Sequence, residues 1–340
     1  MNRRASVSMR DVAALAGVSI GTVSNVLNSP ELVTDPTRER VEAAIEKLGW
    51  VRNESARQLR AGRSRSIGMV VMDIANPFFA DMVRGAEDVL YRQGYSGHIG
   101  NSDQRLDREA TVLNHFQQLR VGGVLLAPIG VGAEAAERLR NRGMPVVLLD
   151  RAAGVEGFCT VGADDLEGGR LAIAHLLEQG HRRIAVVGGP GELSQVRDRR
   201  RGAELAAGVV PDASLLVLST ELLDVGWGSR AAGELLMLPD RERPTAVFAL
   251  NDLLAIGLLQ GFTLAGVRVP EEIAIVGYDD IAFAAAAAVP LSSVRQPRVE
   301  LGASAAGLLF AEIEAAESQQ PHEHRGVRMA PELAVRQSSA

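Results

Sequence analysis

The sequence is short of features on which whole classes of protein depend. Its 340 residues include one cysteine, Cys159, so an internal disulfide framework is excluded and a reducing compartment is indicated. No apolar stretch follows the basic first residues, which argues against a signal peptide and a membrane span. We therefore expect a cytoplasmic protein with no membrane attachment.

Motifs for cofactor, metal and covalent chemistry are also missing. The glycine-rich turn 188–191 lacks the G-x-G-x-x-G spacing, and no G-x-x-x-x-G-K-[ST] sequence occurs. The six histidines show no metal-ligand spacing beyond the pair His322 and His324, whose polar, proline-flanked segment is typical of a solvated loop. No serine, cysteine or lysine stands in a nucleophile motif. The sequence thus predicts no catalytic residue, no metal site and no cofactor.

Charge is unevenly distributed along the chain. Residues 1–65 contain 11 Arg or Lys against 7 Asp or Glu, whereas the whole chain has a formal net charge of −6. A basic amino-terminal segment on an acidic body is typical of a DNA-binding protein whose body should not itself adhere to phosphate. The length and the 46% hydrophobic content favour two or three parts with large cores.

Residues 9–28 have the pattern of two short helices joined by a turn. The apolar positions at which each helix would bury one face against the other are Val12, Ala13, Ala16, Val18, Val23 and Val26. Gly17 falls at the turn, where a positive φ is easiest for glycine, and Ser19 is placed to cap the second helix. A simple helical hairpin would need the same features, so this spacing alone leaves both a hairpin and a helix-turn-helix open.

The next residues favour the helix-turn-helix. Asp35 is an N-cap candidate with Pro36 at the first helical position, apolar residues recur at helical spacing, and Gly49 ends the pattern. Residues 50–66 are basic and too poor in apolar side chains to form a core. We expect a three-helix headpiece followed by a linker.

These segments resemble the headpiece of the lactose/galactose repressor family of bacterial transcriptional regulators, and the resemblance extends through almost all of the chain. Residues 10–19, 22–28 and 37–45 match the headpiece, and residues 53–59 match the hinge helix, which in the family orders on operator DNA in the minor groove. The resemblance implies that Leu59 is the apolar wedge at the central base step, with Ala56 packed beside it. Without the family, Leu59 would be one exposed leucine in a linker.

The base-reading positions depart from the family pattern. They carry Ile20 and Gly21, whose side chains cannot hydrogen-bond a base edge, so we expect Ile20 to contact a thymine methyl group. Polar contacts would come from the neighbouring Thr22, Ser24 and Asn25, the last to an adenine. The full set expected at DNA is Ser8, Arg10, Ser19, Ile20, Gly21, Thr22, Ser24, Asn25, Asn28, Thr34, Thr37, Trp50, Asn53, Ala56, Arg57, Leu59 and Arg60.

From residue 67 onward, short apolar runs alternate with amphipathic stretches. The runs are 67–72, 121–126, 146–149, 184–187, 246–250 and 273–276, and the helical stretches include 79–93, 107–119, 166–178 and 252–265. This alternation predicts parallel sheets covered on both faces, in two similar lobes. Such lobes suit a dinucleotide enzyme, a sugar kinase or a ligand-binding protein. Segment 95–100 is less β-like than a second strand should be.

Polar side chains follow several predicted strands, at the edge where open α/β sheets bind ligands. Asp and Asn can bind paired hydroxyl groups, although both are also common as turn formers and helix caps. The resemblance implies a pocket between the lobes, with Arg197, five residues before a family glycine, as its strongest anchor. Residues 224–230 are loop-like. The expected ligand residues are Asp73, Asn76, Phe78, Phe79, Asp150, Arg197, Trp227, Asn251, Asp279 and Gln296.

The expected fold class is α/β: an all-α helix-turn-helix headpiece with a hinge helix, then a two-lobed type I periplasmic-binding-protein-like domain of parallel sheets covered by helices. The headpiece would span residues 1–52, the hinge helix and linker 53–66, and the effector-binding and dimerisation domain 67–340. The first lobe would comprise about 67–165 and 297–325, and the second about 166–296 and 326–340.

The predicted function is that of a ligand-responsive, sequence-specific transcriptional repressor. A homodimer would bind a palindromic operator in double-stranded DNA, and a small polar effector, a sugar or sugar derivative, would switch its affinity. Lobe closure would change the spacing of the two 53–59 segments across the dimer axis, and a ~100-fold shift in operator affinity requires only about 2.7 kcal/mol. No leucine heptad tail follows Leu333 to indicate a tetramer.

Other classes fit the sequence less well. A transporter's solute-binding protein would lack the headpiece and carry an export signal, and an enzyme would need a catalytic group that the sequence does not display. A cytoplasmic sugar-binding protein without a DNA function stays open as the alternative.

Overall fold

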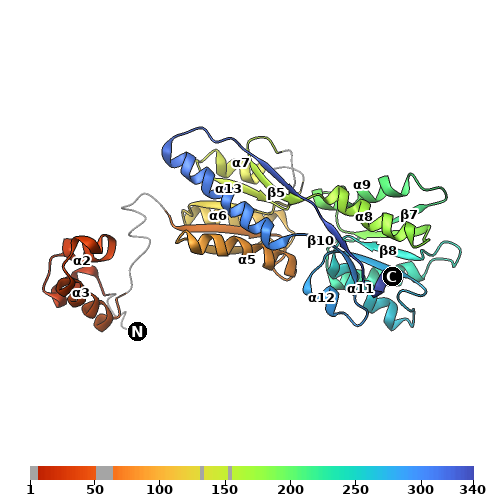
Figure 1. Cartoon of the computed structure of the whole chain (residues 1–340), viewed down its shortest axis with the longest axis horizontal. Helices are drawn as coiled ribbons and strands as arrows, with labels where there is room; N and C mark the ends of the chain where they lie inside the picture. Colours follow the sequence, from red (N-terminus) through yellow and green to blue (C-terminus); the bar gives the residue numbers. More distant parts are fainter. Residues whose placement is uncertain (1–6, 51–63, 131–133, 152–154) are drawn as a thin grey trace. The chain divides into compact units, whose positions relative to one another are not determined.

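The structure is a computed structural model that describes residues 7–50, 64–130, 134–151 and 155–340. The chain forms two compact units, a headpiece within residues 1–63 and a body of residues 64–340 (Figure 1). In the described part of the chain, no helix has the length and apolar character needed to cross a membrane.

The headpiece consists of three helices around a small apolar core. They are α1 (Met9–Ala16), α2 (Ile20–Asn28) and α3 (Asp35–Leu48), with the 3-10 helix η1 (Pro30–Leu32) before α3. The fully buried core side chains are Val12, Ala13, Ala16, Val23, Val26, Val41 and Ala44. Gly17 has a φ of 65° and Gly49 a φ of 58°, so both glycines end helices as predicted. The predicted N-cap of α3 is wrong by one residue, because Thr34 takes that position and Asp35 is already helical.

The first lobe of the body is built on a six-stranded sheet in the order β11-β5-β4-β3-β1-β2, with every neighbouring pair parallel. Its strands are β1 (Ser66–Val71), β2 (Ser96–Asn101), β3 (Gly123–Leu126), β4 (Val146–Leu149), β5 (Cys159–Ala163) and β11 (Gly326–Met329). Helices α5 (Pro77–Arg92) and α13 (Arg298–Ser318) cover one face, and α6 (Leu106–Gln118) and α7 (Glu134–Arg140) cover the other.

The second lobe repeats this plan with the order β12-β10-β9-β8-β6-β7. Its strands are β6 (Arg183–Gly188), β7 (Ser214–Ser219), β8 (Ala246–Ala249), β9 (Ala274–Asp279), β10 (Ser292–Arg295) and β12 (Glu332–Ala334). Its helices are α8 (Asp165–Glu178), α9 (Ser194–Ala207), α10 (Val225–Leu236), α11 (Asp252–Leu264), α12 (Ala282–Ala286) and the 3-10 helix η2 (Gln337–Ser339). Only β12 departs from the predicted parallel arrangement, since it pairs antiparallel with β10.

The strands that the apolar runs predict all form, whereas several weakly apolar strands were not predicted. Segment 96–101 is strand β2 although it has little apolar character, because it lies at a sheet edge and pairs only with β1. Strand β11 corrects the predicted lobe boundary, because residues 326–329 pair with β5 and so belong to the first lobe. The chain therefore crosses between the lobes three times, near residues 164, 297 and 330.

Three pairs of helices approach each other through glycines. A Cβ atom at any of these glycines would lie within 2.3 Å of a backbone oxygen of the facing helix or its neighbouring segment: Gly85, Gly302, Gly169, Gly202, Gly228 and Gly257. The glycines bring α5 against α13, α8 against α9, and α10 against α11. Because only a hydrogen atom fits at these positions, the glycines set how closely the two helices of each pair approach each other.

We expect Gly302→Ala to destabilise the body by about 2 kcal/mol or more, because the new Cβ would lie 1.8 Å from the Met82 carbonyl oxygen. The matched control is Gly307→Ala in the same helix, which has open space around it and should gain about 0.5–1 kcal/mol from helix propensity. Urea unfolding of the two variants measures both effects. Equal stability of the two variants would contradict the close contact of α5 and α13.

Candidate functional site

The residues at the amino-terminal end of α2 are exposed on the surface of the helix-turn-helix. Ser19 caps the helix, as predicted, by accepting a hydrogen bond of 3.0 Å from the Thr22 amide. Ile20 is 42% exposed and Asn25 is also exposed, while Val23 and Val26 face the core. The helix therefore presents Ile20 and Asn25 at its surface, while Val23 and Val26 bury its other face.

The other residues predicted at DNA have mixed surroundings. Ser8 donates from both its amide and its hydroxyl group to Asp11 Oδ2, at 2.7 Å each, and Thr34 bonds to Thr37. Arg10 and Gly21 are exposed, whereas Trp50 packs partly against the headpiece core. The Asn28 amide donates to the Ser24 carbonyl oxygen at 2.8 Å. Asn53, Ala56, Arg57, Leu59 and Arg60 lie outside the described residues.

In the body, polar side chains meet where strands of both sheets end. We call this group the polar cluster; its members are Asn76, Asp150, Asp165, Arg199, Asp279 and Gln296, all of them buried. The Gln296 amide donates to Asp279 Oδ1 at 2.8 Å, and the Asn76 amide donates to Asp279 Oδ2 at 3.4 Å. Asn76 belongs to the first lobe and Asp279 to the second, so the cluster joins the lobes.

Arg199 supplies the positive charge of the polar cluster. Its Nε donates to Asp165 Oδ1 at 2.7 Å, its Nη1 lies 3.8 Å from Asp279 Oδ1, and its guanidinium lies 3.7 Å from the centre of the Tyr278 ring. Burial by itself lowers the pKa of this guanidinium, but Asp165, Tyr278, Asp279 and Asp150 raise it further than burial lowers it. Arg199 is therefore a permanent cation held among acidic side chains.

The prediction that Arg197 is the anchoring arginine is wrong in placement, because Arg197 is exposed and Arg199 is buried. Helix periodicity explains the difference: the buried side of α9 carries Gln195, Val196, Arg199, Gly202, Ala203, Ala206 and Ala207. Position 199 shares this face with the apolar residues, and position 197 points to the other side. The phase of the apolar residues was the signal that could have identified Arg199.

Two acceptor atoms of the polar cluster have no hydrogen-bond partner among the described residues. They are Asp150 Oδ1 and Gln296 Oε1, both buried. Burial raises the pKa of Asp150 to about 7, with Asp165 and Asp279 adding to this effect and Arg199 opposing it. Burial likewise raises the pKa of Asp279 to about 6. Asp150 and Asp279 also have positive φ angles, of 53° and 102°, a strained conformation that is common at binding sites.

The remaining predicted ligand residues differ in burial and in their hydrogen bonds. Phe78 and Phe79 are buried in the core, with ring centroids 5.0 Å apart. Asp73 accepts a local hydrogen bond from the Ala75 amide, and Asn251 caps α11. The segment around Trp227 is not a loop as expected, because Asp224 caps α10 by accepting a hydrogen bond of 2.8 Å from the Trp227 amide.

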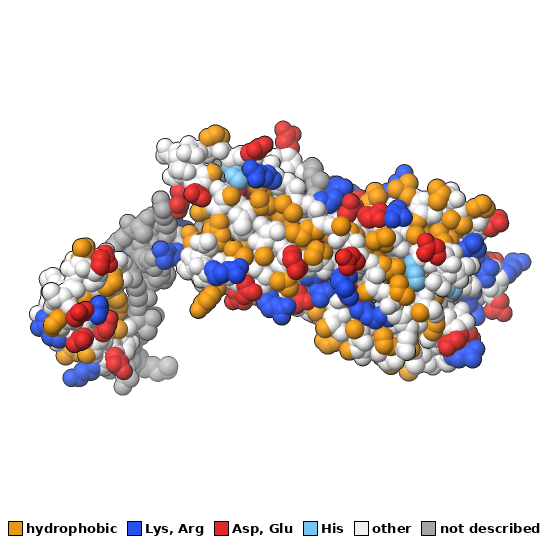
Figure 2. Space-filling view, viewed as in Figure 1, with side chains coloured by type: hydrophobic (Ala, Val, Ile, Leu, Met, Phe, Trp, Pro, Cys, Tyr) orange, Lys and Arg blue, Asp and Glu red, His pale blue; other side chains and the backbone are white. Residues whose placement is uncertain are grey.

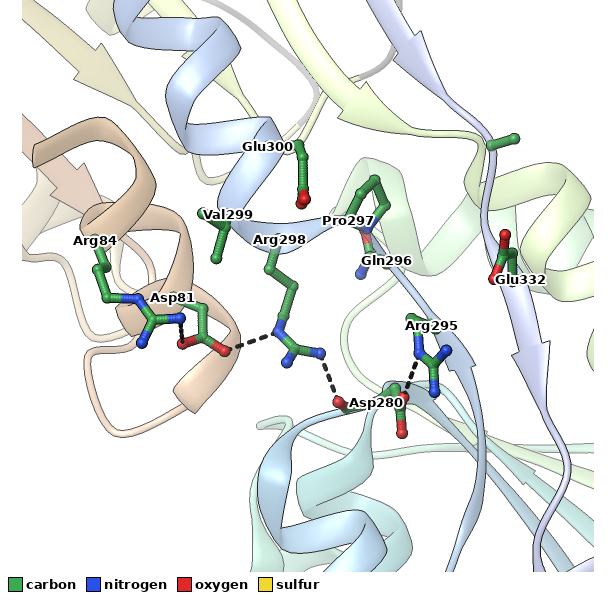
Figure 3. Close-up of a pocket in the computed structure, with 11 residues that line it drawn as sticks. Asp81, Arg84, Asp280, Arg295, Gln296, Pro297, Arg298, Val299, Glu300 and Glu332 are labelled. Carbon is green, nitrogen blue, oxygen red and sulfur yellow. Dashed lines mark hydrogen bonds and ion pairs between the residues drawn. The ribbon is translucent and has the colours of Figure 1, made fainter. Parts of the chain in front are cut away.

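A pocket of about 330 Å³ lies next to the polar cluster, where the chain crosses between the lobes (Figure 3). Arg298 spans it, with its Nε 3.0 Å from Asp81 Oδ2 in the first lobe and its Nη1 donating to the Asp280 carbonyl oxygen in the second. Arg295 pairs with the Asp280 carboxylate at 2.7 Å. Gln296 is the one residue shared with the polar cluster. The arginines Arg84, Arg295 and Arg298 of this pocket pair with Asp81 or Asp280, whereas two acceptors of the polar cluster have no partner among the described residues.

The surface of the body carries charges of both signs. On the face drawn in Figure 2, acidic and basic side chains are interspersed with hydrophobic ones. Several charged side chains of the body form exposed ion pairs within one helix, such as Arg170 with Glu167 and Arg200 with Glu204. Pairs of this kind contribute little to stability.

Residues 320–325 form the predicted irregular segment, and His324 is exposed, but the imidazoles of His322 and His324 lie beside buried side chains of the first lobe. His322 Nε2 lies 3.2 Å from the sulfur of buried Cys159, and His324 Nδ1 lies 3.4 Å from buried Glu312. No sequence motif indicates this grouping, because Cys159 and His322 are 163 positions apart.

Comparison with known proteins gives matches to both units. A family model for bacterial regulatory proteins of the lacI family matches residues 8–53, and one for a periplasmic binding protein-like domain matches residues 173–339. The ribose operon repressor of Bacillus subtilis (strain 168) is 36% identical over 322 residues, covering 95% of this chain and 95% of that protein.

Two further proteins are similar over most of the chain. The HTH-type transcriptional repressor PurR of Aliivibrio fischeri (strain ATCC 700601 / ES114) is 33% identical over 336 residues, which cover 97% of this chain and 98% of that protein. A crystal structure of a LacI family transcriptional regulator from Enterococcus faecium with bound ribose aligns with a TM-score of 0.72 and 34% identity, covering 81% of this chain and 98% of that one.

The raised pKa of Asp150 predicts a pH dependence of stability. The carboxyl group has a pKa of 3.8 when unperturbed and about 7 in the folded protein. Between these values the folded protein keeps a proton that the unfolded chain has released, so Asp150 makes stability fall as the pH rises through this window. Asp150→Asn removes this effect. The free energy of unfolding of the variant minus that of the parent should therefore be roughly 2 kcal/mol larger at pH 8 than at pH 5.

Urea unfolding at the two pH values measures the difference. Asp88→Asn, in an exposed part of α5, makes the same chemical change away from the polar cluster and serves as control. A stability difference between parent and Asp150→Asn that stays constant with pH would show that Asp150 does not titrate in this window.

Proposed function

The chain belongs to the lacI family of bacterial regulatory proteins, and from this premise we propose that its headpiece and its polar cluster are the two ends of one ligand-controlled switch. It is a DNA-binding repressor that responds to a small ligand. The observation that carries the assignment of sites is that one chain combines an exposed helix-turn-helix surface with a buried group of unpaired acceptors.

At the DNA end, we assign base reading to the exposed residues of α2. Exposed Ile20 contacts a thymine methyl group in the major groove, and the Asn25 amide pairs with an adenine. The Ser19 cap holds this end of the helix, so its backbone amides face the phosphates. Two copies in a homodimer bind the two halves of a palindromic operator.

At the ligand end, we assign binding to the polar cluster, and we take the ligand to be a sugar. Hydroxyl groups donate, so they fit Asp150 Oδ1 and Gln296 Oε1, the two buried acceptors that lack partners among the described residues. The Arg199 guanidinium donates to the ligand's oxygens. A relative named for the ribose operon and a similar regulator with bound ribose make ribose the first sugar to test.

The link between the two ends runs through closure of the lobes. Among the described residues, the hydrogen-bonding contacts that cross between them include Asn76 with Asp279, Met72 with Gln195, and Gln104 with Leu223. A sugar that bonds to Asp279 or Gln296 competes with the first of these contacts and so biases closure. Closure in turn alters the spacing of the hinge segments 53–59 of the two protomers, which lie outside the described residues.

Two general properties complete the proposal. We place the protein in the cytoplasm, because binding an operator requires access to the chromosome. We also propose that it acts through binding and not through catalysis, as expected for a family of transcriptional regulators.

Fluorescence anisotropy tests the proposed function. The purified protein is titrated with DNA from upstream of its own gene and with scrambled DNA, at several salt concentrations, with and without ribose and other sugars. We expect tight, salt-dependent binding to the upstream DNA that one sugar weakens or strengthens. If neither this DNA nor a genome-wide selection of fragments is preferred, the protein is a sugar-binding protein without a DNA function.

Asn25→Ala should weaken binding to the operator by roughly tenfold to 100-fold, because a bidentate amide–adenine contact contributes about 1–3 kcal/mol of discrimination. Binding to scrambled DNA should stay nearly unchanged, since contacts to phosphate are intact. Anisotropy on both DNAs measures the ratio. An equal loss on both would remove Asn25 from the base-reading residues.

Arg199→Lys should weaken sugar binding about tenfold to 100-fold, because lysine keeps the charge but loses the planar fork of donors. The matched control is Arg197→Ala, two residues away on the exposed side of α9, which should stay within about threefold of the parent. Isothermal titration with the sugar identified above gives both affinities, and operator binding without sugar confirms folding. A loss confined to Arg197→Ala would restore Arg197 as the anchor.

A further inference from the structure

Four side chains that the proposed switch does not use gather at the far edge of the first lobe. Cys159 is the first residue of β5, Glu312 lies in α13, and His322 and His324 lie in the segment that joins α13 to β11. Cys159 is fully buried and Glu312 is 8% exposed, while the two imidazoles are 19% and 33% exposed. We call these four residues the Cys-His cluster.

The potential ligand atoms of the Cys-His cluster all lie within 4.8 Å of one another. Cys159 Sγ is 3.2 Å from His322 Nε2 and 3.9 Å from His324 Nδ1. Glu312 Oε1 is 3.4 Å from His324 Nδ1 and 4.0 Å from His322 Nε2. One sulfur, two nitrogens and one oxygen therefore surround a single small volume.

These separations match a tetrahedral metal site. Zinc bonds of about 2.0–2.3 Å to nitrogen, oxygen and sulfur place neighbouring ligand atoms roughly 3.3–3.7 Å apart at the tetrahedral angle. The four separations average close to this range, so small side-chain rotations would complete the geometry.

Glu312 gives a second, independent indication. Its Oε1 atom is buried and has no hydrogen-bond partner among the described residues, although it faces the two imidazoles. Its other oxygen accepts from the Val146 amide at 3.3 Å, which fixes the carboxylate with Oε1 directed into the cluster. The Arg325 amide lies 3.4 Å from Cys159 Sγ as a donor. Backbone amides thus orient two of the four ligands, as the outer contacts of metal sites do.

We propose that Cys159, Glu312, His322 and His324 bind one zinc ion. A thiolate and two imidazoles favour a borderline-soft metal over calcium or magnesium, and four protein ligands fill the tetrahedral coordination of a structural zinc. Burial raises the pKa of the Cys159 thiol to about 11. A bound cation supplies the charge that ionises this thiol, so zinc binding releases a proton.

The position of the site indicates a structural role. Cys159 lies at the amino-terminal end of β5, whereas Asp150 follows the carboxyl end of the neighbouring parallel strand β4. The zinc site and the polar cluster therefore lie at opposite ends of the strands of the first sheet. A metal there ties residues 319–325 to β5 just before the chain enters β11. Zinc should therefore stabilise the edge of the first lobe without contacting the sugar.

Metal binding to the full-length, reduced protein tests the proposal. After removal of metals with a chelator, equilibrium dialysis against zinc chloride should give one zinc per chain. The double variant His322→Ala/His324→Ala should lose at least tenfold in zinc affinity. His115→Asn, an exposed histidine in α6, is the matched control and should bind as the parent does.

Two further readouts identify the ligands. Cobalt(II) should give visible ligand-field bands with a thiolate charge-transfer band that Cys159→Ser abolishes. Zinc should raise the thermal midpoint of the parent and of His115→Asn but not that of the double variant. Binding of less than about 0.1 zinc per chain at zinc concentrations well above ~10 μM would overturn the proposal. Equal zinc affinity of the parent and the double variant would also overturn it.

Discussion

The ion pair between Arg199 and Asp165 is the interaction on which the centre of the body depends. A guanidinium that is 3% exposed is tolerable only with carboxylates beside it, because an unpaired buried charge costs several kcal/mol. The pair requires α8 and α9 to lie backbone to backbone, which Gly169 and Gly202 allow. Asp150 and Asp279 approach the same guanidinium from two other strand ends, so helix packing, lobe contact and the polar cluster all depend on one cation.

Local chemistry made much of the headpiece predictable. The turn at Gly17 and the cap at Ser19 depend on residues no more than a few positions apart, and both are as predicted. The alternation of apolar runs likewise predicts the buried strands, because each run must fill a sheet covered on both faces. Edge strands such as β2 and β11 escaped prediction since half-exposed strands need little apolar character.

The body's sites were harder to predict because their members come from distant segments. Arg197 and Arg199 lie on different faces of α9, and counting residues back from a motif glycine does not show which face is buried. Cys159, Glu312, His322 and His324 meet only after α13 has packed on the first sheet and β11 has paired with β5. Residue types at strand ends pointed to Asp150 and Asp279, and the family resemblance pointed to Gln296. The buried partner Asp165 at the start of α8 looks in sequence like an ordinary first-turn carboxylate.

The triple crossing of the chain between the lobes has a consequence for synthesis on the ribosome. Strand β5 is made early, but its neighbour β11 follows roughly 160 residues later, which at translation speeds of about 5–20 residues per second is a delay of roughly 10–30 s. During that time the nascent first lobe has an unpaired edge, and the Cys159 thiol lacks the residues that later cover it. The time needed to translate the second lobe therefore sets how long the first must wait to become complete.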